Sequence, residues 1–205
     1  MTEQKPLTRI QQRNRTAILD AALEVFSRHG FRGATLDQIA REAGLSKPNV
    51  LYYFKSKEAI HSALLNGLMD VWVAPLRALD PTGDPVEELL EYVRKKLALS
   101  RQNPRESRLF ANEIVQGAPH IAADISGPVK TLVDEKAATI AHWVHTGALP
   151  PLDPHHLLFS IWATTQHYAD FDCQVRGILD VSGQDHFVDA EAFLIDFYTR
   201  ALTCP

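Results

Sequence analysis

The sequence predicts an all-helical protein that consists of a small basic N-terminal domain and a larger acidic C-terminal domain. Apolar residues recur at helical spacing in nearly every segment, and the alternating pattern of β-strands is almost absent. Glycines, prolines and capping residues interrupt this pattern at intervals that mark nine helices. The charge is divided unevenly. Residues 1–57 hold ten Lys and Arg against five Asp and Glu, a net charge of +5, whereas residues 58–205 hold 11 against 20, a net charge of −9.

The composition is typical of an intracellular globular protein. At 205 residues, of which 45% are hydrophobic, the chain is long enough to bury a full core. Its two cysteines, Cys173 and Cys204, are too few for a disulfide framework and lack the spacing of a metal site. The N-terminal residues are polar, and no apolar run approaches the roughly 20 residues that span a bilayer. We therefore expect a soluble cytoplasmic protein with no membrane association.

The N-terminal domain is expected to begin with a flexible basic arm over residues 1–13. A first helix should then cover about Arg15 to His29, because its apolar residues fall on one stripe and Gly30 follows as a stop signal. That stripe consists of Ile18, Ala22, Val25 and Phe26.

Residues 35–57 predict a helix-turn-helix followed by a basic entry into the next helix. Thr35 can cap a first short helix, with Gln38 completing a capping box, and Gly44 supplies a tight turn. Ser46 can cap the second short helix, which offers its early residues to base edges in the major groove of DNA. The residues expected near DNA in this segment are Thr35, Ser46, Lys47, Pro48, Asn49, Tyr52, Tyr53 and Lys57.

Each of these side chains suits a particular part of DNA. Lys47 suits a guanine edge or a phosphate, and Asn49 suits an adenine. Thr35, Ser46 and Lys57 lie at helix N-termini, where free backbone N–H groups favour phosphate. Arg9, Arg13 and Arg15 can follow the DNA backbone or enter the minor groove. For one of the two tyrosines, Tyr52 or Tyr53, a core position explains the residue as well as a DNA contact does. Phe54 is expected in the core.

The rest of the chain predicts six further helices, separated by clear breaks. Asp84 with Pro85 and Asp153 with Pro154 are each a capping residue followed by a proline in the first turn of a helix. The expected helices run from Ser56 to near Pro75, over 85–102, over 106–116, up to Thr146-Gly147, over 153–180 and over 189–202.

The whole chain resembles the TetR family of one-component regulators, most specifically through the run LSKPNVLYYFKSKEAI. Four body motifs are similar to the subfamily that regulates pyrimidine utilisation: WVAPL (72–76), ESRLFANEI (106–114), DEKAATIAHWV (134–144) and IWATTQHYADF (161–171). This resemblance implies a DNA-binding domain over residues 1–57 and an effector-binding and dimerisation domain over residues 58–205. It implies a homodimeric regulator, expected to be a repressor, that a pyrimidine base such as uracil or thymine releases from a near-palindromic operator.

The helix 153–180 carries the main candidates for the effector site. Trp162, Gln166 and Asp170 follow one another at four-residue spacing on one face, and an amide beside an aromatic ring suits a flat polar base. The expected effector-binding residues are Trp72, Phe110, Glu113, Trp162, Gln166 and Asp170. Each of them is also compatible with an ordinary helix surface or core position. The last two long helices are expected to form a four-helix bundle with their copies, as the resemblance implies.

Three other functions are weighed against this prediction. A regulator of the same family that responds to larger apolar or cationic compounds would have a large apolar cavity instead. A DNA-organising protein without an effector would bind unrelated sequences alike. An enzyme is not expected, because no catalytic motif is present, and His142 with His145 has metal-ligand spacing but no third ligand. No cofactor and no metal ion are therefore predicted.

Overall fold

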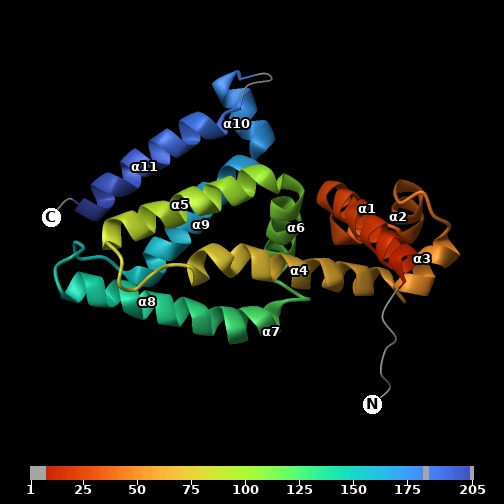
Figure 1. Ribbon diagram of the computed structural model, residues 1–205. Helices are drawn as coiled ribbons and strands as arrows, with labels where there is room; N and C mark the ends of the chain where they lie inside the picture. Colours follow the sequence, from red (N-terminus) through yellow and green to blue (C-terminus); the bar gives the residue numbers. More distant parts are fainter. Residues whose placement is uncertain (1–7, 182–184, 204–205) are drawn as a thin grey trace, which may run out of the picture. The chain divides into compact units, whose positions relative to one another are not determined.

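The structure is a computed structural model that describes residues 8–181 and 185–203, and this part of the chain is helical throughout, without strands (Figure 1). No helix in the described part is long and apolar enough to cross a membrane. Most of the arm predicted over 1–13, the loop predicted at Gly183 and Gln184, and Cys204 lie outside the described residues. The chain forms two compact units, which are described separately below.

The N-terminal unit ends at Leu68 and also includes Leu109–Ile121. Its first three helices are α1 (Arg9–Gly33), α2 (Leu36–Glu42) and α3 (Lys47–Tyr53), and α4 (Lys57–Arg77) begins within it. α2 packs against α1, and α3 packs against α2. These helices share a core of fully buried side chains: Ile18, Phe26, Ile39, Val50 and Ile60.

The first helix begins earlier than predicted, at Arg9 instead of Arg15. The reason is a capping box that the sequence prediction missed: the Thr8 hydroxyl accepts a hydrogen bond from the Gln11 backbone N–H, and the Gln11 side chain accepts one from Thr8. The predicted stop at Gly30 is confirmed, because this residue has a φ of 65°, a left-handed conformation that favours glycine. Only a short turn continues from it to Gly33.

The C-terminal unit contains Met69–Arg108 and the residues from Ala122 onward. Four of its helices build the core: α5 (Pro85–Gln102) packs against both α9 (Pro154–Asp170) and α11 (Phe187–Thr203), and α8 (Lys130–His145) packs against α9. The predicted N-caps are confirmed, since Asp84 and Asp153 accept hydrogen bonds from the first turns of α5 and α9. Core side chains from these helices include Leu89, Val93, Ile140, Leu158, Ile161 and Leu194.

The prediction of nine helices is wrong in detail, because the structure divides two of the expected long helices. The helix predicted over 153–180 is interrupted at Phe171 and continues as α10 (Asp172–Leu179). The segment before α8 forms a short α7 (Ala122–Asp124) and a π-helical turn over Ile125–Val129, which contains Pro128. A proline has no N–H to donate, so it disturbs the regular α-helical ladder at this point.

Two helices extend from one compact unit to the other along the chain. α4 passes the boundary after Leu68, and α6 (Pro104–Val115) passes it after Arg108. The compact units therefore differ from the predicted division into residues 1–57 and 58–205, because they assign the first half of α4 and the end of α6 to the N-terminal unit.

The C-terminal unit exposes large apolar side chains on its last two helices. α11 buries Leu194 and Tyr198 against α5 and α9, whereas Phe193 and Phe197 are 59% and 49% exposed. Ile178 on α10 is 74% exposed. The Phe193 and Phe197 rings stack on each other, and exposed large apolar side chains of this kind are typical of an interface between subunits. It fits the predicted homodimer.

We expect the double substitution Phe193→Glu with Phe197→Glu to convert the dimer into a monomer, because it places two charges in the apolar surface that a second subunit would bury. The mass in solution, measured by light scattering after size exclusion, should fall to that of one chain. The matched control is Val71→Glu, which puts a charge on an exposed apolar residue of α4. A double variant that keeps the mass of two chains would contradict this interface.

Candidate DNA-binding interface and effector site

The helix-turn-helix forms through the local hydrogen bonds that the sequence predicts. Thr35 caps α2 in a capping box with Gln38, whose side-chain oxygen lies 2.8 Å from the Thr35 backbone nitrogen. Ser46 caps α3 by accepting a hydrogen bond from the backbone of Asn49. Between the two helices, Gly44 has a φ of 65°. This turn holds α2 and α3 in the arrangement that places a second helix in the major groove.

One face of α3 is polar and exposed. Lys47, Pro48 and Asn49 are exposed, whereas Val50 is fully buried against the rest of the unit. The Lys47 ammonium lies 2.9 Å from the Asp37 carboxylate, and both side chains are exposed. An exposed pair of this kind contributes little stability, about 0–1 kcal/mol, so a phosphate or base can replace Asp37 at low cost.

The two tyrosines of α3 take different positions. Tyr52 is 71% exposed, whereas Tyr53 is half-buried. Their rings meet edge to face, and α1 fixes both hydroxyls: Gln11 donates to Tyr52 and Asn14 donates to Tyr53. Tyr52 therefore offers its ring to a ligand of this face, and Tyr53 is the tyrosine that supports the structure.

Residues next to α3 serve the core of the unit. Phe54 is buried, as predicted. The guanidinium of Arg15 lies 4.7 Å from the centre of the Phe54 ring, and Arg15 is half-buried. Arg13 is exposed, as is Arg9 on the same helix. Arg15 is thus partly occupied by a cation–π contact, while the two neighbouring arginines remain accessible to DNA.

The Lys57 side chain contacts the end of α1, and the predicted place of Lys57 beside a DNA phosphate stays a prediction. Its ammonium donates hydrogen bonds to the backbone oxygens of Phe31, at 2.7 Å, and Ala34, at 2.8 Å, and lies over the Phe31 ring. These carbonyls follow Gly30, where the regular helix has ended and leaves them without helical partners. Lys57 therefore joins the start of α4 to the end of α1. A sequence pattern cannot reveal this, because the two segments meet only in the folded chain.

A second candidate site lies in the C-terminal unit, between α9 and α5. The Trp162 indole N–H donates to the Tyr92 hydroxyl over 2.6 Å. One turn further along α9, the Gln166 amide is half-buried and has no hydrogen-bonding partner among the described residues. The spacing of Trp162, Gln166 and Asp170 places all three on one face of the helix, as predicted.

The half-buried Asp170 lies at the other end of this face, and a buried lysine of α5 interacts with its charge. Asp170 accepts a hydrogen bond from Ser107, and burial raises the pKa of its carboxyl group. Lys96 on α5 is almost completely buried, and burial lowers its pKa to about 8, a shift that the charge of Asp170 opposes. The ammonium of Lys96 lies 5.1 Å from the ring centre of Trp72. Burying a charge is costly, so such residues are candidates for a functional site.

The sequence prediction missed Tyr92, Lys96 and Ser107. A signal for the first two was present, since they lie one turn apart within the apolar stripe of α5, where a lysine is unusual. Of the six predicted effector residues, Trp72, Trp162, Gln166 and Asp170 belong to the C-terminal unit.

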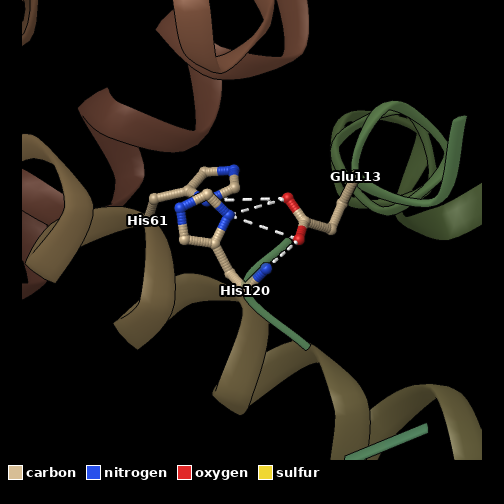
Figure 2. Close-up of side chains that lie close together, drawn as sticks. All are labelled: His61, Glu113 and His120. Carbon is tan, nitrogen blue, oxygen red and sulfur yellow. Dashed lines mark hydrogen bonds and ion pairs between the residues drawn. The ribbon is translucent and has the colours of Figure 1, made fainter. Parts of the chain in front are cut away.

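The other two predicted effector residues, Phe110 and Glu113, belong to the N-terminal unit. The Glu113 carboxylate accepts the backbone N–H of His120 at 2.7 Å and also faces two imidazole rings (Figure 2). An effector contact of Glu113 stays a prediction. Phe110 is half-buried on the same helix, and an effector contact there stays a prediction.

Family models match nearly the whole chain in two parts. Residues 18–64 match the model "Bacterial regulatory proteins, tetR family", and residues 65–204 match "YcdC-like protein, C-terminal region". The chain is also 50% identical over 169 residues to the HTH-type transcriptional regulator RutR of Escherichia coli K12, covering 82% of this chain and 80% of that protein. The chain belongs to the TetR family.

Solved structures of TetR-like proteins have the same fold. A TetR-like regulator from Rhodococcus sp. RHA1 has a TM-score of 0.70 at 21% identity, covering 98% of this chain and 100% of that one. AibR in complex with isovaleryl coenzyme A and operator DNA has a TM-score of 0.71 at 18% identity, covering 90% of this chain and 97% of that one. At these identities the likeness concerns the fold alone.

Membership of the TetR family establishes the general function. The chain is a ligand-responsive, DNA-binding transcriptional regulator that acts as a dimer on operator DNA, and it is not an enzyme. The exposed face of α3 and the polar face of α9 are the parts of the structure that suit these two activities.

We expect Lys47→Ala to weaken operator binding by roughly 1–3 kcal/mol, the range for losing a contact with a base. The affinity is measured by gel-shift titration at a fixed salt concentration, because phosphate contacts depend strongly on salt. Lys95→Ala, which removes an exposed lysine of the C-terminal unit, is the matched control. Equal affinity for Lys47→Ala and wild type would remove Lys47 from the DNA-reading residues.

The buried Lys96 predicts a pH dependence of stability. Its pKa in the folded chain, about 8, lies below the ordinary value of 10.5, so the unfolded chain binds more protons between these two values. The free energy of unfolding should therefore rise from about pH 8 to 10.5 by on the order of 3 kcal/mol from this group. Urea denaturation of wild type and Lys96→Met across this range measures the difference. An equal pH dependence of the free energy of unfolding in the two proteins would contradict the lowered pKa of Lys96.

Proposed function

We propose that this protein represses genes by binding a near-palindromic operator, and that uracil or thymine releases it from the DNA. The recognition helix α3 would read the operator through Lys47, Asn49 and Tyr52, with Arg13 on the backbone. The effector would bind beside α9 in the C-terminal unit, and the protein would act in the cytoplasm together with its DNA target.

The observation that carries the pyrimidine proposal is the polar face of α9. Uracil presents two carbonyl acceptors and two N–H donors around a flat ring. The free Gln166 amide can donate to one carbonyl while it accepts from the adjacent N–H. Trp162 lies one turn away with its indole N–H already satisfied by Tyr92, so its ring can stack on the base without leaving a polar group unpaired.

The charged neighbours add further selectivity for such a ligand. Lys96 can donate to a second carbonyl of the base, and its burial makes this hydrogen bond strong. Asp170 is held in place by Ser107. Cytosine carries an amino group where uracil has a carbonyl, so a site with a lysine donor at that position disfavours it.

Likeness to relatives supports the same effector. The body motifs at 72–76, 106–114, 134–144 and 161–171 resemble regulators of pyrimidine utilisation, and the 50% identity to RutR extends over most of the chain. For release, the effector must bind more tightly to a conformation that does not fit the operator, because only differential affinity shifts the population.

Two alternatives make different predictions. A regulator of larger apolar or cationic compounds would respond to a cationic dye and ignore pyrimidines. A DNA-organising protein without an effector would bind unrelated DNA sequences with similar affinity and respond to neither class of compound. The buried lysine and the free amide favour a small polar effector over both, because neither alternative needs these groups.

We expect uracil or thymine to quench the tryptophan fluorescence of the purified protein in a saturable way, and to release it from operator DNA. Cytosine should have no effect at the same concentration. Gln166→Ala should weaken the response at least about tenfold, because it removes both hydrogen bonds of the amide.

Gln174→Ala is the matched control, because it removes an exposed glutamine of α10. If only the cationic dye quenches the fluorescence, the protein is a regulator of larger apolar or cationic compounds. If no compound changes the fluorescence, the pyrimidine proposal is overturned and the DNA-binding function is unaffected.

A further inference from the structure

Three side chains of the N-terminal unit lie close together (Figure 2). His61 comes from α4, Glu113 from α6 and His120 from the segment that follows α6. One ligand atom of each residue lies within 4.8 Å of those of the other two. All three residues belong to the same compact unit.

The carboxylate of Glu113 is oriented by the backbone. Its Oε1 accepts the His120 backbone N–H at 2.7 Å, which leaves Oε2 facing the two rings. Oε2 lies 3.1 Å from Nδ1 of His120 and 4.0 Å from Nδ1 of His61. The Glu113 and His61 side chains are each only 2% exposed. A buried acidic oxygen therefore stands between two imidazole nitrogens.

The His61 ring has a polar atom that the fold leaves unused in the interior of the unit. Its buried Nδ1 has no hydrogen-bonding partner among the described residues. A buried polar atom without a partner is rare and calls for an explanation.

The spacing of the ligand atoms is close to that of a metal site. A tetrahedral zinc ion with bonds of 2.0–2.1 Å holds its ligand atoms about 3.4 Å apart. Two of the three separations, 3.1 and 4.0 Å, lie on either side of this value, and all three are within 4.8 Å. Two histidines and one carboxylate also form a donor set that zinc uses in proteins.

A cavity beside the three residues leaves room for further ligands. It has a volume of about 460 Å³ and is lined by all three side chains together with Leu109, Asn112 and Gln116. An ion held by three protein ligands keeps an open position, which water or a small anion can fill from such a cavity.

We propose that His61, Glu113 and His120 bind a zinc-like divalent transition-metal ion. The ion joins the second turn of α4 to the end of α6 and to the segment behind it. Because α4 begins four residues after α3 ends, the bound ion stabilises the unit that carries the DNA-reading helix. Ring packing alone also explains the burial of His61, whose ring centre is 4.9 Å from that of Phe26 and 4.7 Å from that of Phe31. It does not explain why the unpaired Nδ1 faces a buried carboxylate.

The test uses the untagged full-length protein after removal of metals with a chelator. Isothermal titration with Zn²⁺ should give one ion per chain, and Co²⁺ should give the visible absorption of a tetrahedral site. Glu113→Gln keeps the size of the side chain and its acceptor for the His120 backbone, but loses the charge. We expect it, and independently His120→Gln, to weaken Zn²⁺ binding at least about tenfold.

The matched control is His142→Gln with His145→Gln, which removes an exposed histidine pair with metal-ligand spacing. This control should bind Zn²⁺ like the wild type. Saturating Zn²⁺ should raise the melting temperature of wild type and control, and leave that of Glu113→Gln unchanged. Absence of saturable binding would overturn the proposal, as would equal affinity in wild type and both site variants, or loss of binding in the control.

Discussion

The DNA-reading face depends on the burial of a few apolar side chains against α1. α2 and α3 have seven residues each, too few to be stable as isolated helices. They persist because Ile39 and Val50 are completely buried in the core of the unit, and because a residue before each helix accepts one N–H of its first turn. The same burial directs Lys47, Asn49 and Tyr52 outward. The polar face is therefore a consequence of the core beneath it.

Both units place ionisable or polar groups in positions where apolar residues would be more stabilising. Lys96 is buried and Asp170 half-buried in the C-terminal unit, and His61 and Glu113 are buried in the N-terminal one. Desolvating such groups opposes folding, since water no longer stabilises their charge. Each unit thus contains a site whose desolvation opposes folding, which suits a protein whose conformation depends on what it binds. A regulator gains from such groups because the ligand supplies the stabilisation that the fold lacks.

Signals within a few residues of one another predicted the structure well. The capping boxes and caps at Thr35, Ser46, Asp84 and Asp153 are formed, because a capping side chain reaches only the next three residues. The break at Phe171 was not predicted, since the apolar spacing continues through it. The partners of Trp162 and Asp170 were also missed, because Tyr92 is 70 residues away and Ser107 is 63 residues away.

The sequence by itself determined that the chain is helical, that its N-terminal part carries a helix-turn-helix, and that Trp162, Gln166 and Asp170 share a face of one helix. Periodicity and capping depend on residues that are close together in the sequence, so the sequence alone reveals them. Only the tertiary structure decided that Lys57 binds carbonyls of α1 and that Glu113 faces His61 and His120. These contacts join segments that are distant in sequence, and they form only when the buried apolar surfaces bring those segments together.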